Sequence, residues 1–471
     1  MARVDARCRA HIPVAVIMGN SNRFLETKTA NISLGGAFLN SNISIPEAEK
    51  VCVRAILPNY GEVEIKSRVL RAERSGIAVG FLGMEPEMRS VLWELIKTHL
   101  DKETTCPYCG SEKANSSRRC MKCGLSINFS SPEYLDTHEA EKISLWSQRL
   151  DASIQELIEH LSEIDRAFIE GTLGHEEKTY LKVEKIVLDG LDAFEEFEKV
   201  AGFFPELLKE KRIEFKNRTD HLFRKSYFMN HARVWPKGYP GDYKILENIY
   251  RNSPLAEGIG FFLDRYFLAR TLAIAVRERL AFMRELLRDE ITTRPGLKIL
   301  NLACGSSREV FELANEIKIS GAKITCVDHD GDALAFSVNR LSYSGIADQV
   351  AMRKYNVLRM VDHDRNMREF GAQDIIYSMG LYDYLADNVL IRLFNSQYRM
   401  LNPGGKAILT FKDSRRYRTP DYHWLVEWAA FYQRTEGESR NLIREAGIPD
   451  SAVETLRDPS EVILFYIVGK E

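Results

Sequence analysis

The sequence predicts a multidomain protein with a small β-barrel at the N-terminus, a cysteine-rich segment, a helical middle region and a C-terminal α/β doubly wound domain. Short strand patterns fill the first part of the chain, and the last part alternates strands with helices. A chain of 471 residues is also too long for one hydrophobic core. The expected domains are a barrel with a closing helix at 1–101, a four-cysteine segment at 102–126, helices at 127–290 and the α/β domain at 291–471.

The composition limits the classes of function. The net charge is −2, so the chain lacks the overall positive charge with which proteins attract a nucleic-acid backbone. No apolar run approaches the roughly 18 residues that a membrane span needs. With 45% hydrophobic and 28% charged residues, a globular protein is expected. Two CxxC pairs and no visible export signal indicate the reducing cytoplasm and a metal site rather than disulfides.

The N-terminal part predicts a barrel because its apolar runs are short and are separated by turn residues. The run EPEMRSVLWELIKTHL follows and is expected to form a helix that closes the barrel. The expected strands are IPVAVIM, KTANISL, GAFLNS, KVCVRAIL, VEIKSRVLRAE and GIAVGFLG.

Polar residues of this barrel predict a ligand. In NISLGG, Asn31 and Ser33 lie on one face of a strand, and Gly36 lets a ligand approach the backbone. Upstream, Arg3 and Arg7 belong to a small arginine cluster, and a guanidinium group can bind phosphate through two hydrogen bonds.

These residues resemble the PilZ domain, a small barrel with the pattern RxxxR followed by [DN]xSxxG. The resemblance implies that c-di-GMP binds at Arg3, Arg7, Asn31, Ser33 and Gly36. A second register pairs Arg7 with His11 instead, and histidine binds phosphate less well at neutral pH. The alternative is a barrel that has lost its ligand and serves as an interaction module.

Four cysteines predict a metal site at Cys106, Cys109, Cys120 and Cys123. Four thiolates at this spacing surround zinc tetrahedrally and leave no open position. The segment resembles a zinc ribbon, and a structural clamp between barrel and helices is favoured over a nucleic-acid finger.

The middle region predicts long helices. Apolar residues repeat at three and four positions in two stretches, and Gly171 and Gly174 mark a turn between them. An antiparallel helix pair is expected, and a dimerising or signal-relaying coiled coil, which would give a homodimer, is the alternative. The repeating residues are Ile154, Leu157, Leu161, Ile164 and Phe168 in one stretch and Tyr180, Val183, Val187, Leu191 and Phe194 in the other.

The C-terminal region predicts strands at LKILNLA, KITCVDH, QDIIYSM, GKAILTF and VILFYIV, separated by helices. The first strand breaks at the small-residue turn ACGSS, which places backbone N–H groups at the carboxyl edge of the sheet, where ligands bind. Only Gly305 of this turn is a glycine, which departs from the GxGxxG of dinucleotide folds. Asp328 or Asp330, at the end of the next strand, can accept hydrogen bonds from ribose hydroxyls. These features predict a nucleoside ligand without a diphosphate.

These residues resemble class I S-adenosylmethionine-dependent methyltransferases over most of residues 296–415. Two departures are an asparagine where most members have an acid at position 301, and other residues where members have glycine at positions 303 and 307. The alternative is an α/β domain that binds another nucleotide. The resemblance implies cofactor binding by Asn301, Ala303, Gly305, Ser307, Asp328, Asp330, Asn356 and Ser378.

A narrower resemblance covers roughly residues 220–471. GYPGDYKILENIY, LACGSSRE and YSMGLYDYL are similar to segments of bacterial 3-hydroxypalmitic acid methyl ester biosynthesis proteins. This resemblance implies a small-molecule acyl substrate that is methylated on a carboxyl oxygen. Residues 261–276 are expected to wall the acyl groove, although ordinary helix core explains them as well.

A carboxylate acceptor needs a hydrogen-bond donor that orients it, whereas a hydroxyl or amine acceptor needs a base. GYPGDY and GLYDYL are expected to meet over the transferred methyl group. The candidate catalytic residues of these loops are Tyr239, Asp242, Tyr382 and Asp383, and Lys412 and His423 are weaker candidates.

The sequence thus favours a methyltransferase controlled by c-di-GMP. One alternative is a non-catalytic c-di-GMP receptor with a methyltransferase-like fold. Another is a protein or nucleic-acid methyltransferase targeted by the zinc ribbon.

Overall fold

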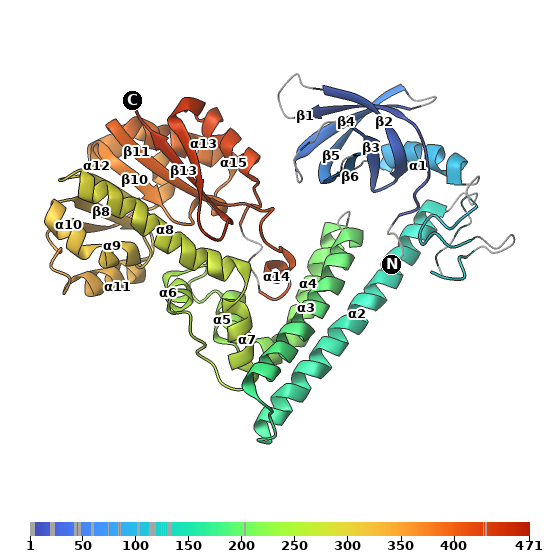
Figure 1. The fold of residues 1–471 in the computed structure, drawn as a ribbon, viewed down its shortest axis with the longest axis horizontal. Coiled ribbons are helices and arrows are strands. Elements are labelled where there is room, and N and C mark those ends of the chain that lie inside the picture. The colour runs from blue at the N-terminus through green and yellow to red at the C-terminus, as the bar shows by residue number, and fades with distance from the viewer. Residues whose placement is uncertain are drawn as a thin grey trace. The chain divides into compact units, whose positions relative to one another are not determined.

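The computed structural model divides into two compact units, Met1–Glu156 with Asp189–Glu214 and Leu157–Leu188 with Phe215–Glu471 (Figure 1). The expected helical region at 127–290 contributes to both units. The structure describes residues 5–18, 24–41, 45, 49–57, 61–73, 75–82, 84, 86–100, 104–112, 119–123, 125, 127, 129, 134–201, 204–426, 428 and 431–471.

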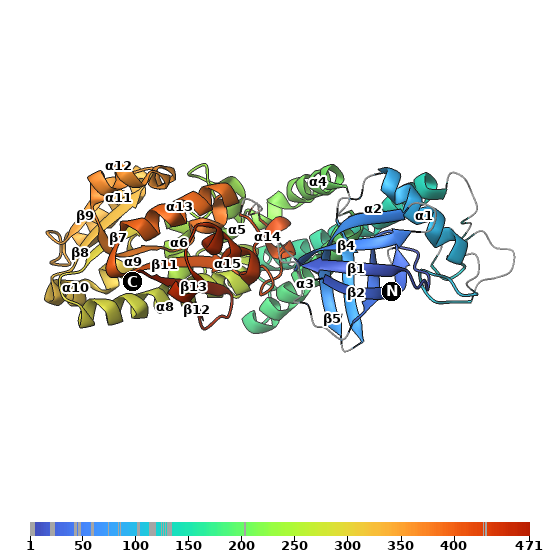
Figure 2. The same cartoon turned by 90° about the horizontal axis from the view of Figure 1, so that it is seen from above.

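The first unit contains a closed barrel in the strand order β1-β2-β3-β6-β5-β4, with antiparallel pairing throughout. Figure 2 labels β1, β2, β4 and β5 of this barrel. Residues of β5 alternate between buried and exposed, so Val63, Ile65 and Val69 enter the barrel core. This barrel confirms the N-terminal part of the expected fold class. The strands are β1 (Pro13–Met18), β2 (Phe24–Ser33), β3 (Gly36–Asn40), β4 (Lys50–Leu57), β5 (Gly61–Glu73) and β6 (Gly76–Phe81).

Helix α1 (Pro86–Leu100) packs against the barrel core through Leu92, Trp93, Ile96 and Leu100. These positions recur at helical spacing, which places them on one face. The cysteine segment joins the same core, and Phe129 packs edge-on against Trp93 with ring centroids 6.3 Å apart.

Three helices follow: α2 (Tyr134–Ile169), α3 (Glu176–Ala201) and α4 (Pro205–Phe223). Gly171 in the turn between α2 and α3 has φ +68°, a conformation that favours glycine. The apolar residues that repeat along α2 and α3 are buried, apart from Phe168, which packs against Gly258.

The second unit is built on a seven-stranded sheet in the order β12-β13-β11-β10-β7-β8-β9. Five neighbouring strands are parallel. In the sheet they lie in the order β9, β8, β7, β10 and β11, which is the doubly wound order 3-2-1-4-5. Strand β13 is antiparallel to both of its neighbours. The strands are β7 (Lys298–Leu302), β8 (Lys323–Asp328), β9 (Val350–Lys354), β10 (Gln373–Ser378), β11 (Leu401–Lys412), β12 (Val453–Arg457) and β13 (Ile463–Gly469).

Helices surround this sheet and confirm the α/β class expected for the C-terminal part. Before the first strand come α5 (Tyr227–Val234), α6 (Tyr243–Arg251), α7 (Ile259–Leu268) and α8 (Thr271–Thr293). Within and after the sheet come α9 (Arg308–Glu312), α10 (Ala314–Ser320), α11 (Gly331–Leu341), η1 (Val357–Val361), α12 (His363–Phe370), η2 (Tyr382–Tyr384), α13 (Asp387–Met400), α14 (Pro420–His423), α15 (Glu436–Glu445) and η3 (Asp450–Ala452). In the part of the chain that the structure describes, no helix is both long and apolar enough to span a membrane.

Candidate functional site

The turn after β7 carries three residues in the left-handed region. Ala303 has φ +54°, Gly305 has φ +54° and Ser307 has φ +47°. Only glycine adopts this conformation without steric cost, so Ala303 and Ser307 are strained by about 1–2 kcal/mol each. The positive φ falls on the two positions where the resembling family has glycine, so the turn keeps the family's shape without its residues.

Asp328 at the end of β8 holds this turn. One carboxylate oxygen accepts a hydrogen bond of 2.8 Å from the Gly305 backbone N–H, and the other accepts one of 2.9 Å from the Asp330 N–H. Each carboxylate oxygen has a second lone pair, so Asp328 can still accept bonds from two ligand hydroxyls. Asp328 and Gly305 both line a cavity of this unit.

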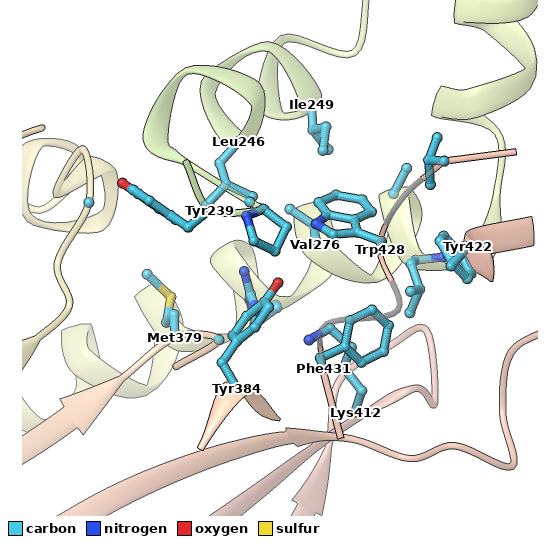
Figure 3. Close-up of a pocket in the computed structure, with 18 of the residues that line it drawn as sticks. Tyr239, Leu246, Ile249, Val276, Met379, Tyr384, Lys412, Tyr422, Trp428 and Phe431 are labelled. Carbon is cyan, nitrogen blue, oxygen red and sulfur yellow. The ribbon is translucent and has the colours of Figure 1, made fainter. Parts of the chain in front are cut away.

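A cavity of about 310 Å³ opens beside the turn (Figure 3). Its size is that of a small-molecule site. Loop 239–243, helices α7 and α8, and the ends of β10 and β11 all contribute to its wall. The lining is mostly apolar and aromatic, and includes Leu246, Ile249, Phe267, Leu272, Ala273, Val276, Met379, Leu425, Val426, Trp428 and Phe431.

The two loops expected to meet over the ligand do meet. A Cβ added to Gly241 would lie 3.2 Å from the Tyr384 hydroxyl and 3.8 Å from the Trp428 ring, so glycine lets these groups approach the loop. Tyr239 also lines the cavity, and its hydroxyl donates a 3.0 Å hydrogen bond to Asp330. Asp330 is thereby part of the wall's support, and it also caps α11.

Asp242 stabilises loop 239–243 on the side away from the cavity. It caps α6 by accepting hydrogen bonds from the Lys244 and Ile245 N–H groups, and its second oxygen lies 2.6 Å from His231 Nε2. Hydrogen bonds from His231 and from the backbone hold the Asp242 pKa below its usual range, although burial opposes this shift. Asp242 does not line the cavity, so its position suits a residue that orients the loop.

Asp383 and Lys412 form a buried ion pair of 2.6 Å, and Lys412 lines the cavity. Burial lowers the pKa of Lys412, and attraction to Asp383 opposes that shift. The Lys412 ammonium also lies 4.7 Å from the centre of the Phe431 ring, and Figure 3 shows the two side by side. Asp383 thus holds Lys412 in place rather than facing the cavity itself.

Tyr384 lines the cavity, whereas the catalytic candidate Tyr382 does not. Tyr382 is fully buried between Phe394 and Phe411, and its hydroxyl donates to the side chain of Gln397. The 3-10 turn of η2 points Tyr382 into the core and Tyr384 into the cavity, so the expected contact of Tyr382 with substrate is corrected in favour of Tyr384. Burial raises the pKa of Tyr384, which keeps its hydroxyl protonated as a donor.

Several cofactor candidates lie around the cavity rather than in its wall. The Asn301 amide donates 2.7 Å to Glu309, and the Ser378 hydroxyl donates 2.7 Å to the Leu302 carbonyl. Asn356 caps η1 beside Val357, which does line the cavity. Ser307 is buried at the start of α9. Ala303, Gly305 and Asp328 are the cofactor candidates that the structure brings together at the wall.

Residues outside the candidate set complete the site. Buried Glu247 accepts hydrogen bonds from Ser306 and Arg340, which joins α6 to the turn and to α11. Arg279 and Trp428 line the cavity. The sequence could have indicated that Arg279 faces the cavity, because Arg279 lies on the same helix face as Leu272 and Val276.

In the barrel, the two halves of the arginine and NISLGG pattern lie side by side. Cys8 and Ile32 form an antiparallel bridge through two backbone hydrogen bonds, which places Arg7 across from Ser33. The Ser33 hydroxyl donates to the Gly36 carbonyl, and the Asn31 Oδ1 atom is buried without a partner in the described structure. Arg3 lies outside the described residues. A Cβ on Gly36 would meet the Val79 carbonyl at 2.3 Å, so close strand packing requires a glycine at this position.

The four cysteines gather as the spacing predicts. Their Sγ atoms all lie within 4.8 Å of one another, which fits the edges of a zinc–thiolate tetrahedron with bonds of about 2.3 Å. This is the only such cluster of His, Cys, Asp or Glu among the described residues.

One comparison with known proteins bears on the barrel. A family model described as "PilZ domain" matches residues 2–98, which confirms the identity expected for the barrel. No curated protein matches the chain in a sequence search.

Solved structures are similar at low identity. A protein described as a possible exported protein from Bordetella parapertussis is 17% identical, covering 69% of this chain and 96% of that chain, with a TM-score of 0.44. An O-methyltransferase family protein from Burkholderia thailandensis is 16% identical, covering 49% and 68%, with a TM-score of 0.33. Magnesium protoporphyrin IX methyltransferase from Synechocystis PCC 6803 with bound S-adenosylmethionine is 11% identical, covering 42% and 84%, with a TM-score of 0.32.

Proposed function

We propose that this protein is an S-adenosylmethionine-dependent methyltransferase that methylates the carboxyl oxygen of a 3-hydroxy fatty acyl substrate under the control of c-di-GMP. The observation that carries the proposal is the strained turn Ala303–Ser307, tied to Asp328 at the mouth of an apolar cavity. Fixed N–H groups and a ribose-binding acid suit a nucleoside, and the apolar wall suits an acyl chain.

The residues present fit the cofactor. The carboxylate of Asp328 keeps lone pairs for two ribose hydroxyls, and Val357 offers an apolar surface for a base. A Cβ on Gly305 would meet only the Tyr243 Cβ at 3.9 Å, so the turn leaves space for a ligand beside its backbone. When bound, the cofactor supplies a methyl group on a positively charged sulfur.

The chain's own groups suit a carboxylate acceptor. Transfer forms an oxygen–carbon bond as the sulfur–carbon bond breaks, and a carboxylate loses no proton, so no base is required. Tyr384 remains protonated and can donate a hydrogen bond, and Asp383 holds the Lys412 side chain in the cavity wall. The apolar wall excludes water, which strengthens these electrostatic contacts.

The PilZ domain supports control by c-di-GMP. Arg7 and Ser33, two residues of the expected binding pattern, lie across from each other, and Asn31 keeps a buried acceptor without a partner in the described structure. The cysteine cluster supports one structural zinc ion, held by Cys106, Cys109, Cys120 and Cys123.

The test is transfer of a labelled methyl group from S-adenosylmethionine to a series of 3-hydroxy acids, with and without c-di-GMP. Label released by alkali as methanol, and a rate that changes with the dinucleotide, are the expected results. Alkali-stable label would move the acceptor to hydroxyl or amine chemistry. Absence of S-adenosylmethionine binding to the purified protein would overturn the activity itself.

A further inference from the structure

One cation in the wall of the cavity forms no ion pair within the described part of the chain. Arg279 on α8 is only 3% exposed and lines the cavity, yet it forms no ion pair with any described residue. Its Nε atom is buried without a hydrogen-bond partner in the described structure. Burying an unpaired guanidinium is costly, so its place beside a cavity points to an anionic ligand.

The nearby acids are already committed elsewhere. Asp383 pairs with Lys412 at 2.6 Å. Both oxygens of Asp458 accept hydrogen bonds, one from Ser460 and one from the Ile463 N–H at 2.9 Å, and burial raises the Asp458 pKa. Arg279 is also close enough to Lys412 to disfavour its charged form. Asp383 and Asp458 are therefore both engaged by groups other than Arg279.

Arg279 packs closely against its surroundings. Its guanidinium packs on the loop after β10, since a Cβ added to Gly380 would lie 2.4 Å from Arg279 Nη1. Its charge also acts on the Tyr250 hydroxyl, because burial raises the Tyr250 pKa and Arg279 opposes that shift. Gly380 has φ +89°, so glycine serves both the backbone conformation and the close approach of Arg279.

An apolar stripe leads away from Arg279 along the same face of α8. Val276, Ala273 and Leu272 line the cavity at the spacing of one helix face. From position 279 to position 272 the helix rises about 10 Å. An extended chain of roughly eight carbons, with bonds of about 1.5 Å, spans that distance.

The stripe ends at a polar cluster. The Tyr266 hydroxyl donates a 2.9 Å hydrogen bond to Asp421, and the Tyr422 hydroxyl accepts one of 3.0 Å from the Leu272 N–H. All three side chains line the cavity, together with Arg270. An apolar chain that continued past Leu272 would meet this polar cluster instead of an apolar wall.

We propose that Arg279 binds the carboxylate of the methyl acceptor and that α8 measures its chain, so that the preferred substrates are medium-chain acids of about eight to ten carbons. This inference rests on the proposed function and adds the anchoring residue and the chain length. Once methylated, the ester is neutral and loses its charge interaction with Arg279, which favours release of the product.

The test measures binding rather than turnover. Calorimetry would follow 3-hydroxy acids of 6 to 16 carbons binding to the full-length protein saturated with S-adenosylhomocysteine. Affinity should rise up to about ten carbons and then level or fall, since each buried methylene contributes about 0.8 kcal/mol. Arg279→Met should weaken binding of the acids about tenfold to a hundredfold, the effect of losing hydrogen bonds to a charged group. Binding of the corresponding methyl esters and of S-adenosylhomocysteine should stay within about twofold.

Two further variants keep the result interpretable. Arg284→Met removes a partly exposed arginine of the same helix that pairs with Glu312, and should leave acid binding unchanged. Val276→Phe should shift the preference to shorter acids. A loss confined to S-adenosylhomocysteine binding in Arg279→Met would assign Arg279 to the cofactor's carboxylate and overturn the inference. Unaffected acid binding would overturn it too, whereas a wild-type protein that binds neither cofactor nor product would overturn the proposed function itself.

Discussion

The backbone N–H of Gly305 donates a 2.8 Å hydrogen bond to the carboxylate of Asp328, which joins the turn after β7 to the end of β8. The same carboxylate accepts a second bond from the Asp330 N–H. Asp328 therefore both shapes the turn and lines the cavity. The conformation of the turn and the proposed cofactor site depend on the same side chain.

Replacing Asp328 should separate these two effects. Asp328→Ala should weaken S-adenosylmethionine binding by about 1.5–3 kcal/mol, because hydrogen bonds to a charged group are lost. Asp328→Asn keeps an acceptor for the Gly305 N–H and should retain more stability than alanine does. Calorimetry and thermal unfolding would measure the two effects, with the exposed Asp364→Ala as the control. Equal cofactor affinity in wild type and Asp328→Ala would contradict the assignment.

The two tyrosines of the GLYDYL loop should behave differently. Tyr384→Phe should lower kcat/KM about tenfold or more, because a donor in the cavity wall is lost, with little change in stability. Tyr382→Phe should leave kcat/KM near the wild-type value and should lower the free energy of unfolding by about 1 kcal/mol, because its hydroxyl bonds Gln397 in the core. The opposite pattern in labelled-methyl assays and urea unfolding would restore Tyr382 as the catalytic candidate.

The cysteine cluster should hold one zinc ion per chain. Replacing Cys120 by serine should remove the metal and destabilise the first unit, because four thiolates complete a structural site. Elemental analysis and thermal unfolding would measure both effects. Cys52→Ser changes a partly buried cysteine outside the cluster and should retain full zinc content. Metal-free wild-type protein with an unchanged unfolding midpoint would rule out the site.

How much of this fold the sequence could predict depended on burial. Buried strands carry continuous apolar runs, which the sequence shows directly. This is why the sequence predicts β7, β8, β10, β11 and β13. The edge strands β9 and β12 were missed, because VAMRK is largely exposed, VETLR is mostly half-buried, and neither carries a continuous apolar signal.

The site was predictable where a residue type signals its chemistry. The turn at Gly305, the acid at 328 and the loop at Tyr239 all line the cavity. Which tyrosine of a short loop faces the cavity depends on the local 3-10 geometry, which sequence spacing alone does not give. The predicted catalytic tyrosine is therefore Tyr382, whereas the structure places Tyr384 in the cavity wall. The isolation of Arg279 from acids is a tertiary property that only the structure reveals.

Stability of the second unit should fall at alkaline pH. Burial, with a further contribution from Asp421, raises the pKa of Tyr266 and Tyr422, so both keep their protons in the folded state. Unfolded tyrosine ionises near pH 10, so the folded state binds more protons above that pH and the free energy of unfolding decreases. Lys412 acts in the opposite direction, because its lowered pKa adds stability as pH rises through it.

Urea unfolding between pH 8 and 11 would measure this slope. Tyr422→Phe should make it shallower, whereas Tyr343→Phe, which removes the hydroxyl of a side chain that is 93% exposed, should leave it unchanged. A slope that Tyr422→Phe does not alter would mean that this hydroxyl ionises alike in both states.

Binding of c-di-GMP should depend on Arg7. The Cys8–Ile32 bridge places Arg7 across from Ser33, so its guanidinium lies where the barrel's two motif halves meet. Arg7→Ala should abolish measurable binding, because a charged hydrogen-bonding group for phosphate is lost. Arg3→Ala should weaken dinucleotide binding only if Arg3 and Arg7 are the two arginines of the motif. His11→Ala should weaken it only in the second register, which pairs Arg7 with His11. In the structure, His11 bonds the Thr29 carbonyl through Nδ1. Arg54→Ala, at an exposed arginine paired with Glu64, is the matched control. Calorimetry at high micromolar c-di-GMP decides between the two registers. If the wild-type protein binds no c-di-GMP at that concentration, the barrel is an interaction module instead.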